Sequence, residues 1–233
     1  MCLNEDEKDK KKREGRSVLY EKERTLIVEM GKKLLASGLV EGTGGNCSIC
    51  VDPGKTFLIS PSGMDYNTIS PEDVVLLGWN GNVLEGERTP SSEWELHREA
   101  YNVRVEARGV VHTHSAYAAA FSCLGKDLPP VHYLIGYAGT SVPWTPYALF
   151  GSPELARNAV PGLKKSRAVL LAHHGVLAVG ESLEKAYVTA EAVEYVAKIY
   201  CHACVMGEPA VLSEEDMARA LRRFDNYGQM PGK

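Results

Sequence analysis

The chain's 233 residues are 44% hydrophobic and 24% charged, as in an ordinary globular protein, and the length suits one domain with a substantial core. The formal net charge of −4 argues against a nucleic-acid partner, because no basic excess is present to neutralise phosphates. No apolar run reaches the roughly 18 residues that span a bilayer, and the charged N-terminus is unlike a secretory signal, so we expect a cytoplasmic protein without a membrane partner.

Residues 1–18 and the segment that follows differ in composition. The first stretch (MCLNEDEKDKKKREGRS) mixes six basic and five acidic side chains with almost no apolar ones, which is typical of a disordered tail. From about Tyr20, apolar residues recur at spacings of three and four and predict a helix that ends at Gly38. We therefore expect a charged tail over 1–18 and one folded domain over 19–233.

Turn residues divide the next part of the chain into short apolar runs. A glycine-rich turn at 41–46 (EGTGGN) leads into one run, and a second run at 56–60 (TFLIS) stops at Pro61-Ser62-Gly63. The Asn80-Gly81 pair between two further runs predicts a β-hairpin. Runs of this length between turns are typical of strands.

The segment 89–102 (TPSSEWELHREAYN) has the pattern of a helix with a marked start. Ser92 and Glu95 match the S-x-x-E capping box, in which each side chain bonds to the backbone of the other. This capping pattern places the Glu93 carboxylate in the first turn of the predicted helix.

Histidines mark the two strand regions that follow. The segment 109–116 (GVVHTHSA) predicts a strand whose alternation puts His112 and His114 on one face. The segment 168–179 (AVLLAHHGVLAV) predicts two apolar strands that meet at a His-His-Gly turn.

Two helices close the chain, over about 182–206 and 213–224, with Ser182 and Ser213 as their N-terminal caps. Neither internal repeats nor a domain linker interrupts the pattern. Helices interleaved with short hairpins predict one α/β domain in which helices cover a sheet.

Four cysteines occur as two pairs with metal-like spacing, Cys47/Cys50 and Cys201/Cys204. Together they could form a zinc site, and each pair could be a redox pair. However, Cys201 and Cys204 lie on one face of a predicted helix, where reduced cysteine packs as a small hydrophobe. Cys47 and Cys50 lie in a predicted strand and would point to opposite faces. We therefore favour a structural role for both pairs.

An H-x-H strand can place two imidazoles on one metal ion, because alternate residues point the same way. Catalytic zinc sites use three protein ligands and an open position. His112 and His114 supply two ligands, and either His173 or His174 can supply the third from its turn beside Gly175.

Three segments could bind an anion through backbone N–H groups and hydroxyls. They are Thr43-Gly44-Gly45-Asn46, Ser62-Gly63 and Ser91-Ser92, the last at a predicted helix start. Each could equally be a turn or a cap that serves only the fold. Their occurrence beside a candidate metal strand favours a phosphorylated ligand.

Seven motifs follow one another along the chain: TGGN, SPSG, PSSEW, VVHTHS, PPVHYLIG, PYALFG and LLAHHG. In this order they resemble the class II aldolase/adducin family, and within it the branch that cleaves L-fuculose 1-phosphate. The resemblance runs from about residue 22 to 228 and implies an α/β layered domain with a largely antiparallel central sheet flanked by helices. It also implies a homotetramer with active sites between subunits.

The resemblance implies roles for single residues. His112, His114 and His174 match the ligands of one Zn²⁺ per subunit, and Glu93 matches a carboxylate that binds the metal at rest and then acts as acid and base. Tyr133 matches a tyrosine that reaches the neighbouring subunit's site and protonates the aldehyde oxygen, and Tyr227 matches a tyrosine of a C-terminal tail. The residues that match the phosphate pocket are Gly45, Asn46, Ser62, Gly63, Ser91 and Ser92.

The function that the resemblance implies is a zinc-dependent aldolase, an aldehyde-lyase of carbohydrate metabolism. It would reversibly cleave L-fuculose 1-phosphate, or a similar ketose 1-phosphate, to dihydroxyacetone phosphate and L-lactaldehyde. Zinc would stabilise the enediolate as a Lewis acid, while Glu93 moves the proton.

Other activities occur on the same scaffold. They are pentulose-phosphate 4-epimerase, methylthioribulose-phosphate dehydratase and decarboxylase chemistry, together with a non-catalytic, adducin-like interaction module. Epimerases of the family carry Asp where this chain has Glu93, and the adducin relatives lack the full histidine set. The motifs therefore favour the aldolase.

Overall fold

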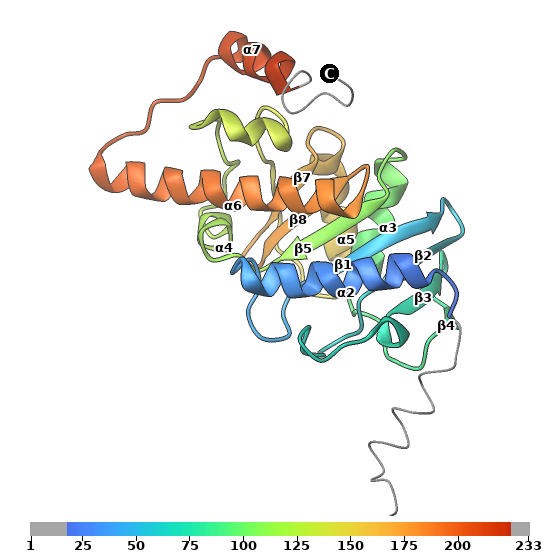
Figure 1. Ribbon diagram of the computed structural model, residues 1–233. Helices are drawn as coiled ribbons and strands as arrows, with labels where there is room; N and C mark the ends of the chain where they lie inside the picture. Colours follow the sequence, from blue (N-terminus) through green and yellow to red (C-terminus); the bar gives the residue numbers. More distant parts are fainter. Residues whose placement is uncertain (1–17, 225–233) are drawn as a thin grey trace, which may run out of the picture.

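The fold is built on a mixed sheet in a computed structural model that describes residues 18–224. Among these residues the strands are β1 (Asn46–Asp52), β2 (Thr56–Ile59), β3 (Val75–Gly78), β4 (Val83–Glu85), β5 (Gly109–Thr113), β6 (Trp144–Thr145), β7 (Ala168–Leu171) and β8 (Gly175–Gly180). They form one sheet in the order β4-β3-β2-β1-β5-β8-β7-β6 (Figure 1). Only β6 and β7 pair in parallel, so the expected largely antiparallel sheet is confirmed.

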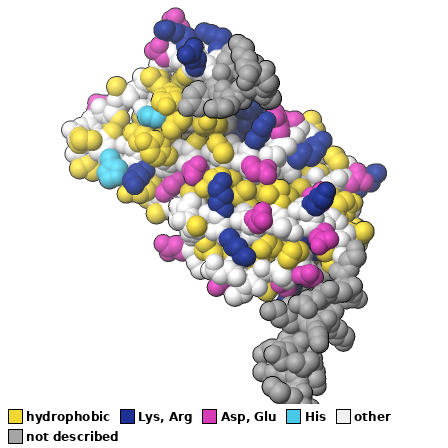
Figure 2. Space-filling model, in the orientation of Figure 1, with side chains coloured by type: hydrophobic (Ala, Val, Ile, Leu, Met, Phe, Trp, Pro, Cys, Tyr) yellow, Lys and Arg dark blue, Asp and Glu magenta, His cyan; other side chains and the backbone are white. Residues whose placement is uncertain are grey.

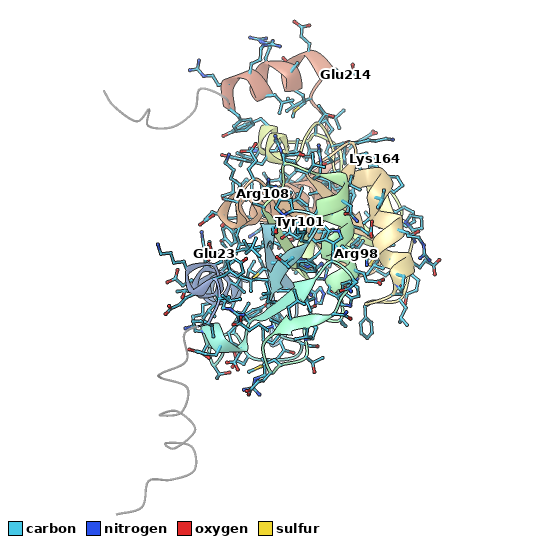
Figure 3. The ribbon with its side chains drawn as sticks, turned by 90° about the vertical axis from the view of Figure 1, so that its right-hand side faces the viewer. Glu23, Arg98, Tyr101, Arg108, Lys164 and Glu214 are labelled. Carbon is cyan, nitrogen blue, oxygen red and sulfur yellow. The ribbon has the colours of Figure 1, made fainter. Side chains whose placement is uncertain are left out.

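Helices cover both faces of this sheet. These helices are α2 (Glu21–Ala36), α3 (Trp94–Val103), α4 (Ala116–Ser122), α5 (Pro153–Leu163) and α6 (Leu183–Met206). The described residues also form α7 (Glu214–Phe224), which packs on the 3₁₀ turn η2 (Tyr133–Tyr137), and a second 3₁₀ turn η1 (Pro71–Asp73). Helices α2, α4 and α6 pack on one face, and α3 and α5 pack on the other. Figure 3 shows the sheet between α2 on one side and α3 and α5 on the other.

The strands contribute alternate side chains to two separate cores. In β5, Val111 packs toward α2 and α6, whereas Val110 packs toward α3 and α5, and both are fully buried. Because neither face of β7 (AVLL) meets water, this strand is apolar throughout and does not alternate. The segment 168–179 is thus two buried strands joined by a turn, as predicted.

Close backbone packing fixes α6 against the sheet. A Cβ at Gly109 would lie 2.4 Å from Leu183 Cα, and one at Gly180 would lie 2.3 Å from Ala186 N. Ser182 caps α6 as predicted, since its hydroxyl accepts the Lys185 N–H at 3.3 Å. The first turn of α6 therefore lies directly on β5 and β8.

The cysteine pairs follow the prediction in part. Cys47 and Cys50 lie in β1 and are buried in opposite cores, and burial raises the pKa of the Cys47 thiol to about 12. Cys201 is half-buried on α6, but Cys204 is exposed, so its predicted packing as a hydrophobe is wrong. Nothing in this geometry joins the two pairs into one metal site.

Two sequence expectations fall at or beyond the ends of the described segment. The charged tail predicted for 1–18 lies outside it except for its last residue, and Tyr227 lies outside it as well. Within 18–224, no helix is both long enough and apolar enough to cross a membrane.

Candidate active site

Four side chains from separate parts of the sequence converge at one end of β5. Glu93, His112, His114 and His174 each offer a donor atom, and these atoms lie within 4.8 Å of one another. The Nε2 atoms of His112 and His114 are 2.9 Å apart, and that of His174 is 3.2 and 3.1 Å from them. Zinc ligands about 2.0–2.1 Å from the ion in a tetrahedron lie about 3.3 Å apart, so the spacing suits one small cation.

Local backbone geometry brings the three histidines together. His112 lies in β5, while His114 follows the strand, which ends at Thr113 and is shorter than the predicted 109–116. The β7–β8 turn is tight: His173 has φ 54°, and a Cβ at Gly175 would lie 2.0 Å from Thr113 O. This turn places His174 beside β5 and leaves His173 exposed, with its ring 6.2 Å from that of Tyr147.

His112 is held in the tautomer that a metal ligand needs. Its Nδ1 lies 2.9 Å from the Val176 carbonyl, which can only accept a hydrogen bond. Burial lowers the pKa of this imidazole to about 3, so the ring is neutral and Nε2 presents a lone pair to the other donors. A backbone carbonyl behind a ligating histidine is a common second partner in metal sites.

Glu93 approaches the same point from the start of α3. Its Oε2 accepts a hydrogen bond from Asn46 Nδ2 at 2.8 Å and lies 3.2 Å from His112 Nε2. Its Oε1 lies 3.5 Å from His174 Nε2 and has no hydrogen-bond partner, although it is buried. Leaving such an oxygen unsatisfied costs about 1–3 kcal/mol or more, which a bound cation would offset.

The predicted capping box at this helix start is wrong. Helix α3 begins at Trp94 with Glu93 as its N-cap, and the Ser91 hydroxyl accepts the Glu93 N–H at 3.3 Å. Ser92 makes no cap hydrogen bond, and Glu95 instead lies 3.9 Å from Arg98. The helix starts one residue later than the S-x-x-E pattern implies, because Glu93 rather than Ser92 occupies the N-cap position.

A cavity of about 150 Å³ adjoins the four donors. It is lined by Glu93, His114 and His174 and by every residue predicted for the phosphate pocket, namely Gly45, Asn46, Ser62, Gly63, Ser91 and Ser92. Thr43, Gly44, Pro61 and Phe150 complete the lining, and within 18–224 no Lys or Arg contributes to it. The cavity therefore offers neutral donors, backbone N–H groups and hydroxyls, beside the candidate metal centre.

A buried polar chain behind Glu93 is a feature that the sequence analysis missed. Asn46 Oδ1 lies 2.5 Å from His97 Nε2, His97 Nδ1 lies 2.7 Å from Ser48 Oγ, and Ser48 Oγ lies 2.7 Å from Tyr101 OH. Two spacings in the sequence could have predicted it. Asn46 and Ser48 are two apart on a strand, and His97 and Tyr101 are four apart on a helix, so each pair shares a face. Phe150, at the rim of the cavity, was missed as well.

Of the two predicted catalytic tyrosines, Tyr133 is not among the residues that line this cavity. Tyr133 lies on η2, half exposed, with its ring stacked on Phe224 at a centroid distance of 6.1 Å. An approach to a neighbouring subunit stays a prediction, and Tyr227 lies outside the described residues.

The donor set predicts that each chain binds one divalent ion. We expect His174→Asn to weaken metal affinity by at least about tenfold, because it removes a ligand from a preformed set. The matched variant His173→Asn, at the adjacent exposed histidine, should retain the metal, and Asn tolerates its left-handed backbone. Elemental analysis and chelator competition measure both, and equal metal content in the two variants would contradict the site.

The buried histidines predict acid sensitivity in the metal-free protein. Burial lowers the pKa of His97 and of His112 from 6.5 to about 3. Between these values the unfolded chain binds more protons than the folded one, so stability is lost as pH falls below about 6.5. The loss should approach about 1.4 kcal/mol per pH unit for each histidine. Urea unfolding of chelated protein from about pH 7.5 to about pH 4.5 tests this, and a flat profile would refute it.

Comparisons with known proteins agree with the arrangement of fold and site. Residues 25–201 match the family described as Class II Aldolase and Adducin N-terminal domain. The 5-deoxy-D-ribulose 1-phosphate aldolase of Bacillus thuringiensis serovar kurstaki is 45% identical over 212 residues, which cover 91% of this chain and 100% of that protein. The L-fuculose phosphate aldolase of Haemophilus influenzae is 41% identical, with 87% and 93% covered.

A solved structure of an L-fuculose 1-phosphate aldolase has the same fold, with a TM-score of 0.84 at 43% identity, and the match covers 88% of this chain and 96% of that one. The resemblance seen in the motifs is thereby confirmed over most of the chain. Class II aldolases use a divalent metal, and the Glu93 and histidine cluster can hold one. The chain belongs to the class II aldolase and adducin family, and it is an enzyme of the aldolase type.

Proposed function

We propose that this aldolase reversibly cleaves a ketose 1-phosphate with a terminal methyl group into dihydroxyacetone phosphate and a short aldehyde. L-Fuculose 1-phosphate would give L-lactaldehyde, and 5-deoxyribulose 1-phosphate would give acetaldehyde, and relatives named for each substrate are 41% and 45% identical to this chain. The observation that carries the proposal is the position of Glu93, which lines the cavity and also adjoins three imidazole donors.

The cavity suits the phosphate end of the dihydroxyacetone phosphate half. Ser91 and Ser92 precede α3, where free backbone N–H groups and the helix dipole favour an anion. Gly45 and Gly63, with φ of 69° and 66°, have left-handed backbone of the kind found in anion-binding turns. Binding energy at the phosphate would hold the reacting carbon beside Glu93.

Glu93 would transfer the proton at the carbon next to the carbonyl. In cleavage the bond between the third and fourth sugar carbons breaks, its electrons pass into the carbonyl as an enediolate, and Glu93 protonates the third carbon. In synthesis the same carboxylate removes that proton. When bound, the divalent ion, which we propose to be zinc, supplies Lewis-acid stabilisation of the enediolate charge. Asn46 anchors Oε2, which leaves Oε1 as the oxygen that exchanges the proton.

Proton transfer on the aldehyde side would come from a second subunit. We propose that Tyr133 reaches a neighbouring subunit's site within a homotetramer. There it would protonate the aldehyde oxygen in synthesis and take the proton of the hydroxyl on the fourth sugar carbon in cleavage. A catalytic role for Tyr227 stays a prediction from the resemblance. Half-exposed Tyr133 and Tyr195 flank His132, with ring centroids 4.6 and 5.7 Å from it. Figure 2 shows hydrophobic side chains gathered over the C-terminal part of α6, and Val205 and Met206 there are 88% and 83% exposed. An apolar surface of this kind supports an interface.

The proposed reaction is tested by product identification. Metal-loaded protein is incubated with dihydroxyacetone phosphate and either L-lactaldehyde or acetaldehyde, and the products are identified by NMR. We expect a ketose 1-phosphate from at least one aldehyde. Interconversion of pentulose phosphates without cleavage would favour an epimerase, and loss of water from a ketose phosphate would favour a dehydratase.

Glu93→Gln is the variant that tests the proton-transfer role. We expect turnover to fall by about 10²–10⁴-fold, because an amide cannot exchange the proton. Glu95→Gln, two residues along the same helix and outside the cavity, is the control and should resemble the native enzyme. Metal content is measured in both, and near-native turnover of Glu93→Gln at full metal occupancy would refute the role.

The shared-site arrangement predicts activity in mixed oligomers. Glu93→Gln and Tyr133→Phe chains should each have low activity as pure proteins. Co-expressed hybrids should regain activity, because some sites then combine an intact Glu93 with an intact Tyr133 from the other chain. Light scattering should give four times the 25.5 kDa chain mass. A monomer with full activity, or hybrids without recovery, would contradict the arrangement.

A further inference from the structure

A continuous chain of polar groups runs from Glu93 into the layer between β1 and α3. It passes from Asn46 to His97, then to Ser48, and ends at Tyr101, whose position on α3 is labelled in Figure 3. His97 and Ser48 are fully buried, and Asn46 and Tyr101 are 5% and 4% exposed. None of His97, Ser48 and Tyr101 lines the cavity, so their polar atoms serve something other than direct ligand contact.

The direction of every hydrogen bond in this chain follows from the carboxylate at its end. Ionised Glu93 can only accept, so Asn46 presents its Nδ2–H to Oε2 and its Oδ1 to His97. His97 Nε2 must therefore carry the hydrogen, and in the neutral ring Nδ1 accepts from the Ser48 hydroxyl. The Ser48 oxygen then accepts from the Tyr101 hydroxyl.

His97 is the member that fixes this direction at Asn46. An amide is nearly symmetric in shape, and without a donor on its far side it can rotate and turn Oδ1 toward Glu93. Two acceptor oxygens would then face each other, and the carboxylate would lose its anchor at Oε2. The neighbouring Oε1 would no longer be held at its place between His174 and the cavity.

We propose that His97 is a positioning residue of the aldolase, whose Nε2–H orients the Asn46 amide and thereby holds Glu93 with Oε2 anchored and Oε1 free for proton transfer. The inference rests on the proposed function of Glu93. It also assigns Asn46 a role beyond the phosphate pocket, because its amide spans the gap between His97 and the carboxylate.

Two substitutions at His97 separate positioning from mere packing. In His97→Gln the side-chain amide reaches the place of Nε2 and can still donate to Asn46. In His97→Asn the amide reaches only the place of Nδ1, so it keeps Ser48 and loses Asn46. Tyr101→Phe removes the far end of the chain and leaves the donor to Asn46 intact.

The readout is exchange of the carbon-bound hydrogens of dihydroxyacetone phosphate with deuterium from solvent, followed by NMR without aldehyde. This exchange reports the Glu93 step alone. We expect about a 10–100-fold loss of exchange rate in His97→Asn, the range seen for partners of metal ligands. His97→Gln and Tyr101→Phe should stay within about threefold of the native rate, with KM for dihydroxyacetone phosphate little changed in all three.

Metal content and thermal midpoint are measured on the same samples. A rate loss that follows the thermal midpoint across the three variants, or that follows loss of metal, would overturn the positioning role, as would native exchange in His97→Asn. If His97→Asn does not fold, His97→Gln still decides, because a tenfold or greater loss with the Asn46 donor retained is incompatible with the inference. Absence of exchange in the native, metal-loaded enzyme would instead refute the proposed function.

Discussion

Glu93 Oε1 is a buried carboxylate oxygen without a hydrogen-bond partner, and the groups around it leave room for a cation rather than supply a hydrogen-bond donor. Three imidazole nitrogens lie about it, and their burial disfavours the protonated forms that would pair with the carboxylate. A cluster of this kind destabilises the folded state, and a cation that binds only the folded state stabilises it again. The unsatisfied Oε1 and the neutral imidazoles that destabilise the metal-free fold are therefore the same groups that favour binding of a catalytic cation.

The sheet makes this cluster possible because both of its faces are covered. Two apolar cores hold β1, β5 and β8 in fixed register, so Asn46 pairs with His112 and His112 pairs with Leu177. Four donors from distant segments then meet without large side-chain freedom. The conformational entropy of these side chains is lost when the chain folds, so little more is lost when the substrate binds.

Local patterns in the sequence predicted the parts of the structure that depend on local chemistry. The alternation of His112 and His114, the Ser182 cap and the His-His-Gly turn follow from strand and helix periodicity. The start of α3 was predicted one residue too early, because Ser92 suits an N-cap by its residue type, whereas in the fold Glu93 takes that position and Ser91 accepts the Glu93 N–H. The choice of His174 over His173 came from the resemblance, and the left-handed backbone at His173 gives it a physical reason. The chain from Asn46 to Tyr101 joins a strand to a helix about fifty residues away, and no local pattern reports such pairing.

In the proposed reaction, the cavity formed by the described residues binds the phosphate half of the substrate, and the aldehyde half contacts the rim of the cavity. Phe150 lines that rim and is 66% exposed, and among residues 18–224 no charged side chain other than Glu93 lines the cavity. L-Lactaldehyde differs from acetaldehyde by one hydroxymethylene group. An apolar rim rejects an added hydroxyl only weakly, by about 10²-fold at most, whereas a site built to bond that hydroxyl rejects the shorter aldehyde far more strongly. An enzyme with this rim should therefore turn over both aldehydes, and strong selectivity would require a polar partner from the second subunit of the proposed oligomer.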